Sequence, residues 1–502
     1  MRHAFPFRHA RWALLHVSLA TLLVACGGGS NSGSAFFFPP PAATTPPPNV
    51  TTPPVVTPPV TPVVPTASVD ATTRVITNKI YTQTATLTGG TASSISWDWG
   101  DGSAAGTTNP AAHLWYTPGS FSSSLSAVVN GTSVSATRTT VAVSDPVSSK
   151  DSHTCALKPD NTVTCWGHNN SGQLGNGNTT DTGVPGAVLG VGGTGLLGDV
   201  IGVAAAGTHT CALKSDGTVA CWGYNGHGQL GNGTLVDSSA PVGVAGLSGV
   251  IALEANGPRS CALMSDHTVM CWGYNGNGEL GNGTTVDSSS PVVVTGLGNV
   301  VTLSLGVDHA CALKSDATVS CWGYNGYGQL GDGTTINSST IVSATGIGNV
   351  VALAGGNTHT CALLADGTVS CWGYGRDGEL GSGTATNRRT PALVPGLSNV
   401  VALTAGQYHN CAVKSDATLS CWGFNNQGQV GDGTTVNKLV PTAVPGIANV
   451  VSVAAGLFHS CALTSDGSVS CWGSNVNGQL GNSTMVNSLA LVAATGGTTY
   501  WK

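Results

Sequence analysis

Charged residues are scarce in this chain of 502 residues: Asp, Glu, Lys and Arg make up 8% of the sequence, against a usual share of about 25%. Only three glutamates and eight lysines occur, so the residues that coat the surfaces of soluble helices are nearly missing. Glycine, with 71 residues, is about twice as frequent as its usual ~7% share. The composition therefore excludes an ordinary helical protein and predicts an all-β, turn-rich fold.

The chain also lacks a basic stripe. Its formal net charge is -6, and residues 151–502 carry ten basic and nineteen acidic residues, a net charge of -9. A nucleic acid is therefore not expected as a partner. No set of nucleophile, base and orienting acid recurs, and no phosphate loop or helix-borne metal motif is found. We expect no enzyme activity, no cofactor and no metal site.

The N-terminus has the pattern of an export signal. Three arginines precede an apolar run over residues 12–25, which is too short for a membrane-spanning helix. Residues 23–27, Leu-Val-Ala-Cys-Gly, resemble the bacterial lipobox, which implies a lipoprotein signal peptide over 1–25 and lipidation of Cys26. A generic signal with a chance cysteine is the alternative. By analogy with lipoprotein sorting, Gly27 in place of aspartate favours the outer membrane or cell surface.

Residues 26–67 are rich in Gly and Ser and then in Pro and Thr, a composition that forms no core. We interpret them as a disordered linker, extended by its prolines into a stalk. A ligand for a proline-recognising module is the alternative.

Residues 68–145 alternate apolar and polar side chains and predict a small β-sandwich. Residues 97–103, Trp-Asp-Trp-Gly-Asp-Gly-Ser, resemble the signature of polycystic kidney disease (PKD) domains. The resemblance implies an immunoglobulin-like sandwich that acts as a spacer or adhesion module. Asp98 and Asp101 are read either as cation ligands or, preferably, as acceptors of backbone N–H bonds in a tight turn.

The remaining cysteines form seven identical C-x9-C pairs. The pairs recur every 50 residues, except for a first interval of 56, and such a period is typical of propellers or solenoids. The fourteen residues are Cys155 and Cys165, Cys211 and Cys221, Cys261 and Cys271, Cys311 and Cys321, Cys361 and Cys371, Cys411 and Cys421, and Cys461 and Cys471.

Each repeat resembles the regulator of chromosome condensation repeat. The second unit shows His209-Thr-Cys-Ala-Leu, then Trp222-Gly, then residues 228–231, Gly-Gln-Leu-Gly. The resemblance implies a seven-bladed β-propeller over 146–502. The first unit lacks one strand before Cys155, and we expect Tyr500 and Trp501, near the C-terminus, to supply it.

The turn residues predict how the cysteines pair. With Gly217 in a left-handed conformation, a three-residue loop places Cys211 opposite Cys221. In an exported chain this register favours seven cross-strand disulfides. Zinc binding by His209, Cys211 and Cys221 is the alternative, but Arg259 replaces the histidine in the third unit.

Positions that vary between otherwise similar repeats are the candidates for partner binding, and they fall in two loops. The loop before His contains Asp308, Tyr408, Leu457 and Phe458; the loop after Trp-Gly contains Tyr224, Tyr274, Tyr324, Tyr374 and Phe424. Aromatic loops on a rigid ring suit protein recognition. The alternative for the tyrosines is packing between adjacent blades, as is expected of the repeated tryptophans.

These observations predict an exported, lipid-anchored protein of the cell envelope or surface. Its propeller would act as a monomeric scaffold for an unidentified protein or glycan, and would meet the membrane only through the lipid. Guanine-nucleotide exchange, the activity of the family's nuclear member, and inhibition of a secreted or periplasmic enzyme are the alternatives.

Overall fold

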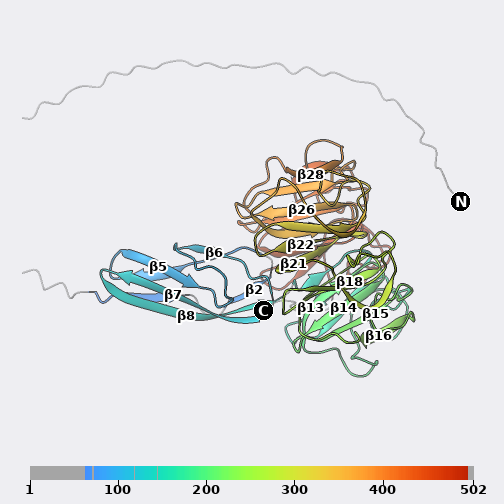
Figure 1. The fold of residues 1–502 in the computed structure, drawn as a ribbon, viewed down its shortest axis with the longest axis horizontal. Helices are drawn as coiled ribbons and strands as arrows, with labels where there is room; N and C mark the ends of the chain where they lie inside the picture. Colours follow the sequence, from blue (N-terminus) through green and yellow to red (C-terminus); the bar gives the residue numbers. More distant parts are fainter. Residues whose placement is uncertain (1–62, 70–72, 78, 118, 144, 496–502) are drawn as a thin grey trace, which may run out of the picture. The chain divides into compact units, whose positions relative to one another are not determined.

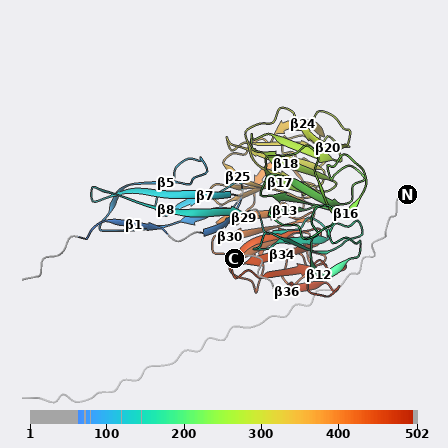
Figure 2. The same ribbon diagram turned by 90° about the horizontal axis from the view of Figure 1, so that it is seen from below.

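The computed structural model describes residues 63–69, 73–77, 79–117, 119–143 and 145–495. Within these ranges the chain forms thirty-six strands and no helix (Figures 1 and 2). None of the described elements is a helix that could cross a membrane. The predicted signal peptide, Cys26, almost all of the linker, Tyr500 and Trp501 lie outside the described residues.

The N-terminal part of the described chain has eight strands: β1 Thr66–Val69, β2 Thr73–Ile76, β3 Tyr81–Gln83, β4 Ala85–Thr88, β5 Ala92–Asp98, β6 Ala111–His113, β7 Gly119–Val129 and β8 Thr132–Val143. One sheet has the order β2-β8-β7-β5, and two pairs, β1-β4 and β3-β6, accompany it. Trp97, Trp99 and Trp115 are almost fully buried in one core. This aromatic core accounts for the Trp-rich motif, because large rings bury much apolar area in a small unit.

The turn after β5 explains the two aspartates. Asp98 Oδ1 accepts the Gly100 N–H at 2.9 Å, and Asp101 Oδ1 accepts the Ser103 N–H at 3.1 Å. The other carboxylate oxygen of Asp101 lies 2.8 Å from His113 Nε2. The prediction that both side chains act as turn acceptors is therefore confirmed.

The cysteine repeats fold into seven four-stranded antiparallel sheets in residues 147–493. Each repeat contributes one sheet, and we number these units one to seven along the chain. The first strands are β9 Val147–Ser148, β13 Val200–Ala205, β17 Val250–Asn256, β21 Val300–Leu305, β25 Val350–Gly355, β29 Val400–Ala405 and β33 Val450–Ala455. The second are β10 His153–Leu157, β14 His209–Lys214, β18 Arg259–Met264, β22 His309–Lys314, β26 His359–Leu364, β30 His409–Lys414 and β34 His459–Thr464. The third are β11 Val163–Gly167, β15 Val219–Gly223, β19 Val269–Gly273, β23 Val319–Gly323, β27 Val369–Gly373, β31 Leu419–Gly423 and β35 Val469–Gly473. The fourth are β12 Thr182–Ala187, β16 Ser238–Gly243, β20 Ser288–Val293, β24 Ser338–Ser343, β28 Arg388–Leu393, β32 Lys438–Ala443 and β36 Ser488–Ala493.

The sheets follow one another in a closed cycle. Each first strand contacts the first strand of the next sheet, and β33 contacts β9. In unit one the strand beside β10 is β9, with Ala156 opposite Val147 and Cys155 opposite Ser148. The prediction that the C-terminus supplies this strand is therefore wrong, because the segment just before unit one already occupies the edge of β10.

Cross-strand register brings the cysteines together in every unit. Cys211 lies opposite Cys221, as predicted from the turn, and the two form a disulfide with a Cα–Cα distance of 4.0 Å. All seven predicted pairs form disulfides in the structure. Residues with positive φ stand at the turn position of each unit, glycine in some and Asn161, His267, Ala317 or Ala417 in others. The same loop therefore forms where glycine is replaced.

The repeated tryptophans join neighbouring sheets. Trp222 is fully buried, and its Nε1 donates to the carbonyl of Gln173 in the preceding unit at 2.9 Å. Trp166 of unit one donates in the same way to Gln479 of unit seven, also at 2.9 Å. The prediction that these rings form the core between blades is confirmed.

Candidate functional site

Each sheet has a histidine end, where its second strand begins and its third strand ends. The buried histidines there link successive units through Nε2: His209 lies 2.8 Å from Ser260 Oγ, and His409 lies 2.7 Å from Ser460 Oγ. Burial lowers the pKa of His209 to about 3, so the ring is neutral at physiological pH. These histidines contact hydroxyls and amides of the next unit. All fourteen repeat cysteines are in disulfides, so Cys211 and Cys221 are not free thiolates of the kind that the zinc alternative requires.

Unit three departs from this pattern through Arg259, which is 1% exposed. Its Nη2 donates to the carbonyls of Gly306, at 2.9 Å, and His309. The charge of Arg259 also acts on Asp308, whose pKa is raised by burial and pulled back by the arginine. Asp308 is half-buried and belongs to this electrostatic cluster, not to the aromatic residues described next.

Both variable loops lie at the histidine end, as the hairpin register predicted from the turn requires. Strand register places His209 opposite Gly223, so the loop that precedes His209 and the loop that follows Gly223 are neighbours. The Tyr224 N–H donates to the Thr208 carbonyl at 2.9 Å, and the Phe424 N–H donates to the Tyr408 carbonyl at 2.9 Å. The two sets of predicted residues therefore share one end of the ring.

Three predicted residues form an aromatic cluster between units six and seven. The rings of Tyr408 and Phe458 stack with centroids 5.9 Å apart, and Phe424 lies 6.1 Å from Tyr408 and 5.9 Å from Phe458. Asn357 Nδ2 donates to the Tyr408 hydroxyl at 2.9 Å. All three rings and the neighbouring Leu457 are half-buried. Because Tyr408 and Phe458 come from adjacent units, we expected these two rings and Leu457 to be neighbours, and the stacking of Tyr408 on Phe458 agrees with that expectation. Phe424, from the other loop, joins them, and the exposure of all these side chains is partial.

The tyrosine series packs across junctions between units. The ring of His227 lies 5.1 Å from Tyr274 of the next unit, and Tyr327 lies 5.1 Å from Tyr374. Within unit two the ring of Tyr224 lies 6.3 Å from that of His227, and within unit four the ring of Tyr324 lies 6.2 Å from that of Tyr327. Packing between blades therefore explains part of the conservation of aromatic character among the repeats, while Tyr327 remains 37% exposed.

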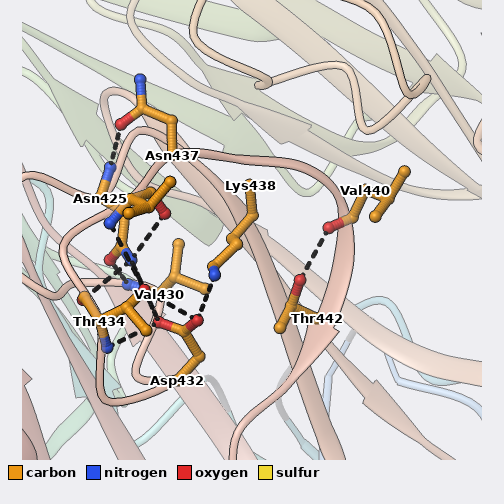
Figure 3. A network of polar contacts seen from close by, with 9 residues as sticks. Asn425, Val430, Asp432, Thr434, Asn437, Lys438, Val440 and Thr442 are labelled. Atoms are coloured by element: carbon orange, nitrogen blue, oxygen red, sulfur yellow. Dashed lines mark hydrogen bonds and ion pairs between the residues drawn. The ribbon is translucent and has the colours of Figure 1, made fainter. Parts of the chain in front are cut away.

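A polar network around a buried asparagine holds the loop after Trp-Gly in shape in six of the seven units. In unit six the Asn425 amide donates to Asp432 Oδ1 at 3.2 Å and to the Thr434 carbonyl at 3.0 Å, and it accepts the Val430 N–H at 2.9 Å (Figure 3). Lys438 pairs with Asp432 in the same loop (Figure 3). One buried amide thus satisfies several backbone groups and makes the loop a rigid platform.

Unit five departs from the other units in this loop. Gly375 stands where the others have asparagine, and Arg376, Arg388 and Arg389 stand where none of the others has arginine. Glu379 stands where five units have glutamine and unit three has Glu279. It is fully buried, and burial raises its pKa to about 8. The sequence indicated Arg376 as a varied residue of this loop, but we did not select Arg388, Arg389 or Glu379 as candidate site residues, although the departure of the two arginines from the repeat was a signal that could have identified them.

A cavity of about 150 Å³ lies among the first strands. Lys150 and Glu254 line it, and Lys150 Nζ donates to the Ala405 carbonyl at 3.0 Å. Burial raises the pKa of Glu254 to about 7, and the positive charge of Lys150 opposes that rise. No group of three or more potential metal ligands occurs among the described side chains.

Comparison with known proteins identifies the repeats. A family model described as "RCC1-like domain" matches residues 192–495, and models of the "Regulator of chromosome condensation (RCC1) repeat" match 146–173 and 160–213. The Ultraviolet-B receptor UVR8 of Arabidopsis thaliana is 36% identical over 99 residues, 20% of this chain and 22% of UVR8. The human E3 ubiquitin-protein ligase HERC2 is 32% identical over 97 residues, 19% of this chain and 2% of HERC2.

Solved structures show the same fold. Yeast RCC1 (Prp20), solved with Kap60, has a TM-score of 0.59 at 24% identity, covering 68% of this chain and 85% of the other. Human WBSCR16 has a TM-score of 0.55 at 24% identity, covering 62% and 84%. At these identities the likeness concerns the fold alone, and the curated relatives above match this chain over about a fifth of their length or less.

Proposed function

Because this chain belongs to the RCC1-like domain family, we propose that its seven sheets are the blades of a closed β-propeller that binds a protein or glycan partner at the histidine end. The single observation that carries the proposal is the aromatic cluster of Tyr408, Phe424 and Phe458. It joins two units, it is half-buried, and equivalent positions in the other units do not repeat all three rings. Half-exposed aromatic groups on a rigid support are typical of interaction surfaces.

The comparisons support a protein partner in particular. One related structure is described by the binding properties of yeast Prp20p to Gsp1p and histones, and another shows yeast RCC1 with Kap60. Both descriptions concern one protein, yeast Prp20, and each names a protein partner. The local rigidity provided by the disulfides and the asparagine loops lowers the entropy that a loop loses on binding.

We further propose that residues 1–25 are a lipoprotein signal, that Cys26 carries the lipid and that the protein is displayed at the outer membrane or cell surface. The lipobox-like residues 23–27 support this, as does the exported character implied by seven disulfides. In this proposal the linker is a stalk and the sandwich over 68–145 is a PKD-like spacer of immunoglobulin-like fold. Its buried Trp core and aspartate turn support that assignment.

The binding proposal is tested by cross-linking the full chain on intact cells and identifying captured proteins by mass spectrometry. We expect Tyr408→Ala and Phe458→Ala to lose capture of the partner that the wild type retains, with thermal stability nearly unchanged because both rings are only half-buried. Tyr224→Ala, at the equivalent position to Phe424 but outside the cluster, is the matched control and should retain capture. If the cluster variants still bind and instead unfold at clearly lower temperature, the cluster is structural and the proposal fails.

A further inference from the structure

Three arginines set unit five apart from the six other copies of the repeat. At the position of Arg388 the other units have Ser, Thr or Lys, and at the position of Arg389 they have Ser, Leu or Gly. At the position of Arg376 they have Gly, Asn or Val. Arginine therefore appears three times within fourteen residues of unit five. The other six units form the same loop and strand without arginine at these positions.

The structure places these arginines near two tyrosines, and the charge of Arg376 acts on the Tyr374 hydroxyl. Arg388 pairs in register with Gly373, directly before Tyr374. Arg389 lies against the loop of unit four, because a Cβ added to Gly328 would stand 2.6 Å from Arg389 Cα and 2.9 Å from its Cγ. Gly328 follows Tyr327, whose ring lies 5.1 Å from that of Tyr374. We call Arg376, Arg388, Arg389, Tyr327 and Tyr374 the arginine patch.

The guanidinium groups of the patch are available to a ligand. All three arginines are exposed, and none takes part in an ion pair with the described residues. Lys214, Lys314 and Lys438, by contrast, lie within 4 Å of an aspartate. The patch thus holds unpaired positive charge in a propeller whose net charge is negative.

The acidic groups near the patch are either engaged in hydrogen bonds or buried. Asp377 accepts hydrogen bonds from the Tyr374 hydroxyl and from Asn437 Nδ2, both at 3.2 Å. Glu379 is buried beneath the loop, and its raised pKa of about 8 leaves it mostly protonated at neutral pH. Asp332, in the neighbouring loop, is engaged by the Asn325 amide and by Thr334. Three exposed guanidinium groups therefore lie near two half-buried carboxylates, Asp377 and Asp332, whose oxygens already accept hydrogen bonds.

We propose that the arginine patch binds an acidic segment of a partner protein, with carboxylates pairing to the guanidinium groups and apolar atoms packing on Tyr327. Guanidinium groups bind carboxylates through paired hydrogen bonds, and Arg and Tyr are the residues most enriched at protein interfaces. The acidic remainder of the ring repels such a segment, which directs it to this junction. A nucleic acid is disfavoured because it requires a longer basic stripe. The inference rests on the proposed binding function and adds the chemistry of the partner.

The test measures binding of a fluorescein-labelled oligoglutamate to the full chain by fluorescence anisotropy at about 20 mM and about 150 mM salt. We expect salt-sensitive binding that weakens by about tenfold or more in R388S/R389S, which restores the serines of units two to four. The matched control K314S/K414S removes the same two positive charges from hairpins at the opposite end of the sheets, and should change affinity by less than about twofold. Arg376→Gly, which restores the residue of units two to four, provides an independent loss of affinity.

The outcomes separate this inference from the binding proposal and from other ligands. Absence of oligoglutamate binding, or equal loss in the control and the serine variants, overturns it. Tighter binding of polygalacturonate that is lost in R388S/R389S assigns the patch to an acidic glycan and also overturns it. Tyr408→Ala and Phe458→Ala should bind oligoglutamate as the wild type does, so failure of the aromatic cluster as a binding site leaves this assay unaffected. Thermal unfolding of each variant establishes that it is folded.

Discussion

His459 Nε2 lies 2.9 Å from Thr154 Oγ1, and this hydrogen bond joins unit seven to unit one across 305 residues of sequence. The same relationship links His153 to Thr210 and His309 to Thr360, each at 2.8 Å. Buried imidazoles therefore link neighbouring units through hydrogen bonds. Burial disfavours the charged form of these histidines, so they are neutral in the folded protein. Protonation at acidic pH should therefore weaken the links between units, and the stability of the seven-sheet assembly should depend on pH.

Acidic pH should lower the free energy of unfolding of the seven-sheet assembly. Burial lowers the pKa of His209 from 6.5 to about 3, so its contribution to stability is complete above pH 6.5 and is lost as the pH falls toward 3. We expect His209→Gln, which keeps a neutral partner for Ser260, to take up about one proton fewer on unfolding in this range. Urea unfolding at several pH values measures the difference. An unchanged pH slope in the variant would show that His209 is not buried in its neutral form.

Alkaline pH should weaken unit five through Glu379. Its folded pKa is raised to about 8 from 4.5, so the folded state holds a proton that the unfolded state releases, and stability falls as pH rises between these values. Glu379→Gln removes this loss, so its melting temperature should exceed that of the wild type by an amount that grows from about pH 5 to about pH 9. Glu279→Gln is the control: both oxygens of Glu279 accept hydrogen bonds from Asn277, so this variant should be destabilised.

The disulfides should be inaccessible until the protein unfolds. Cys211 and Cys221 are fully buried, as are the equivalent pairs, which are at most 1% exposed. Non-reducing peptide mapping should therefore yield seven links within units, and reductant should open them only in denaturant. In the chain-entropy estimate each link adds at most ~3 kcal/mol, because the loops are short. Free thiols in the native protein, or disulfides between units, would contradict the seven disulfides within units.

Cys26 should carry the lipid. Labelled palmitate should enter the wild-type protein and not Cys26→Ser, because the lipobox-like residues 23–27 place this cysteine at the expected modification site. Gly27→Asp is the companion variant, which should retain the label and shift the protein toward the inner membrane. Continued labelling of Cys26→Ser would refute the proposed anchor.

The sequence alone determined the features that repeat locally. The 50-residue interval, the turn residues and the alternation of strands predicted an all-β ring and placed Cys211 opposite Cys221, because pairing within a hairpin depends on a few adjacent residues. Turn chemistry likewise predicted the roles of Asp98 and Asp101.

Only the tertiary structure decided what lies between repeats. It showed that Asp308 belongs with Arg259, and that Tyr408 stacks on Phe458. It also brought Arg389 of unit five against the loop that carries Tyr327 of unit four. The contacts of Asp308 with Arg259, Tyr408 with Phe458 and Arg389 with Gly328 join residues about fifty or more positions apart. Their geometry depends on how one sheet packs against the next, which the pattern within a single repeat does not encode.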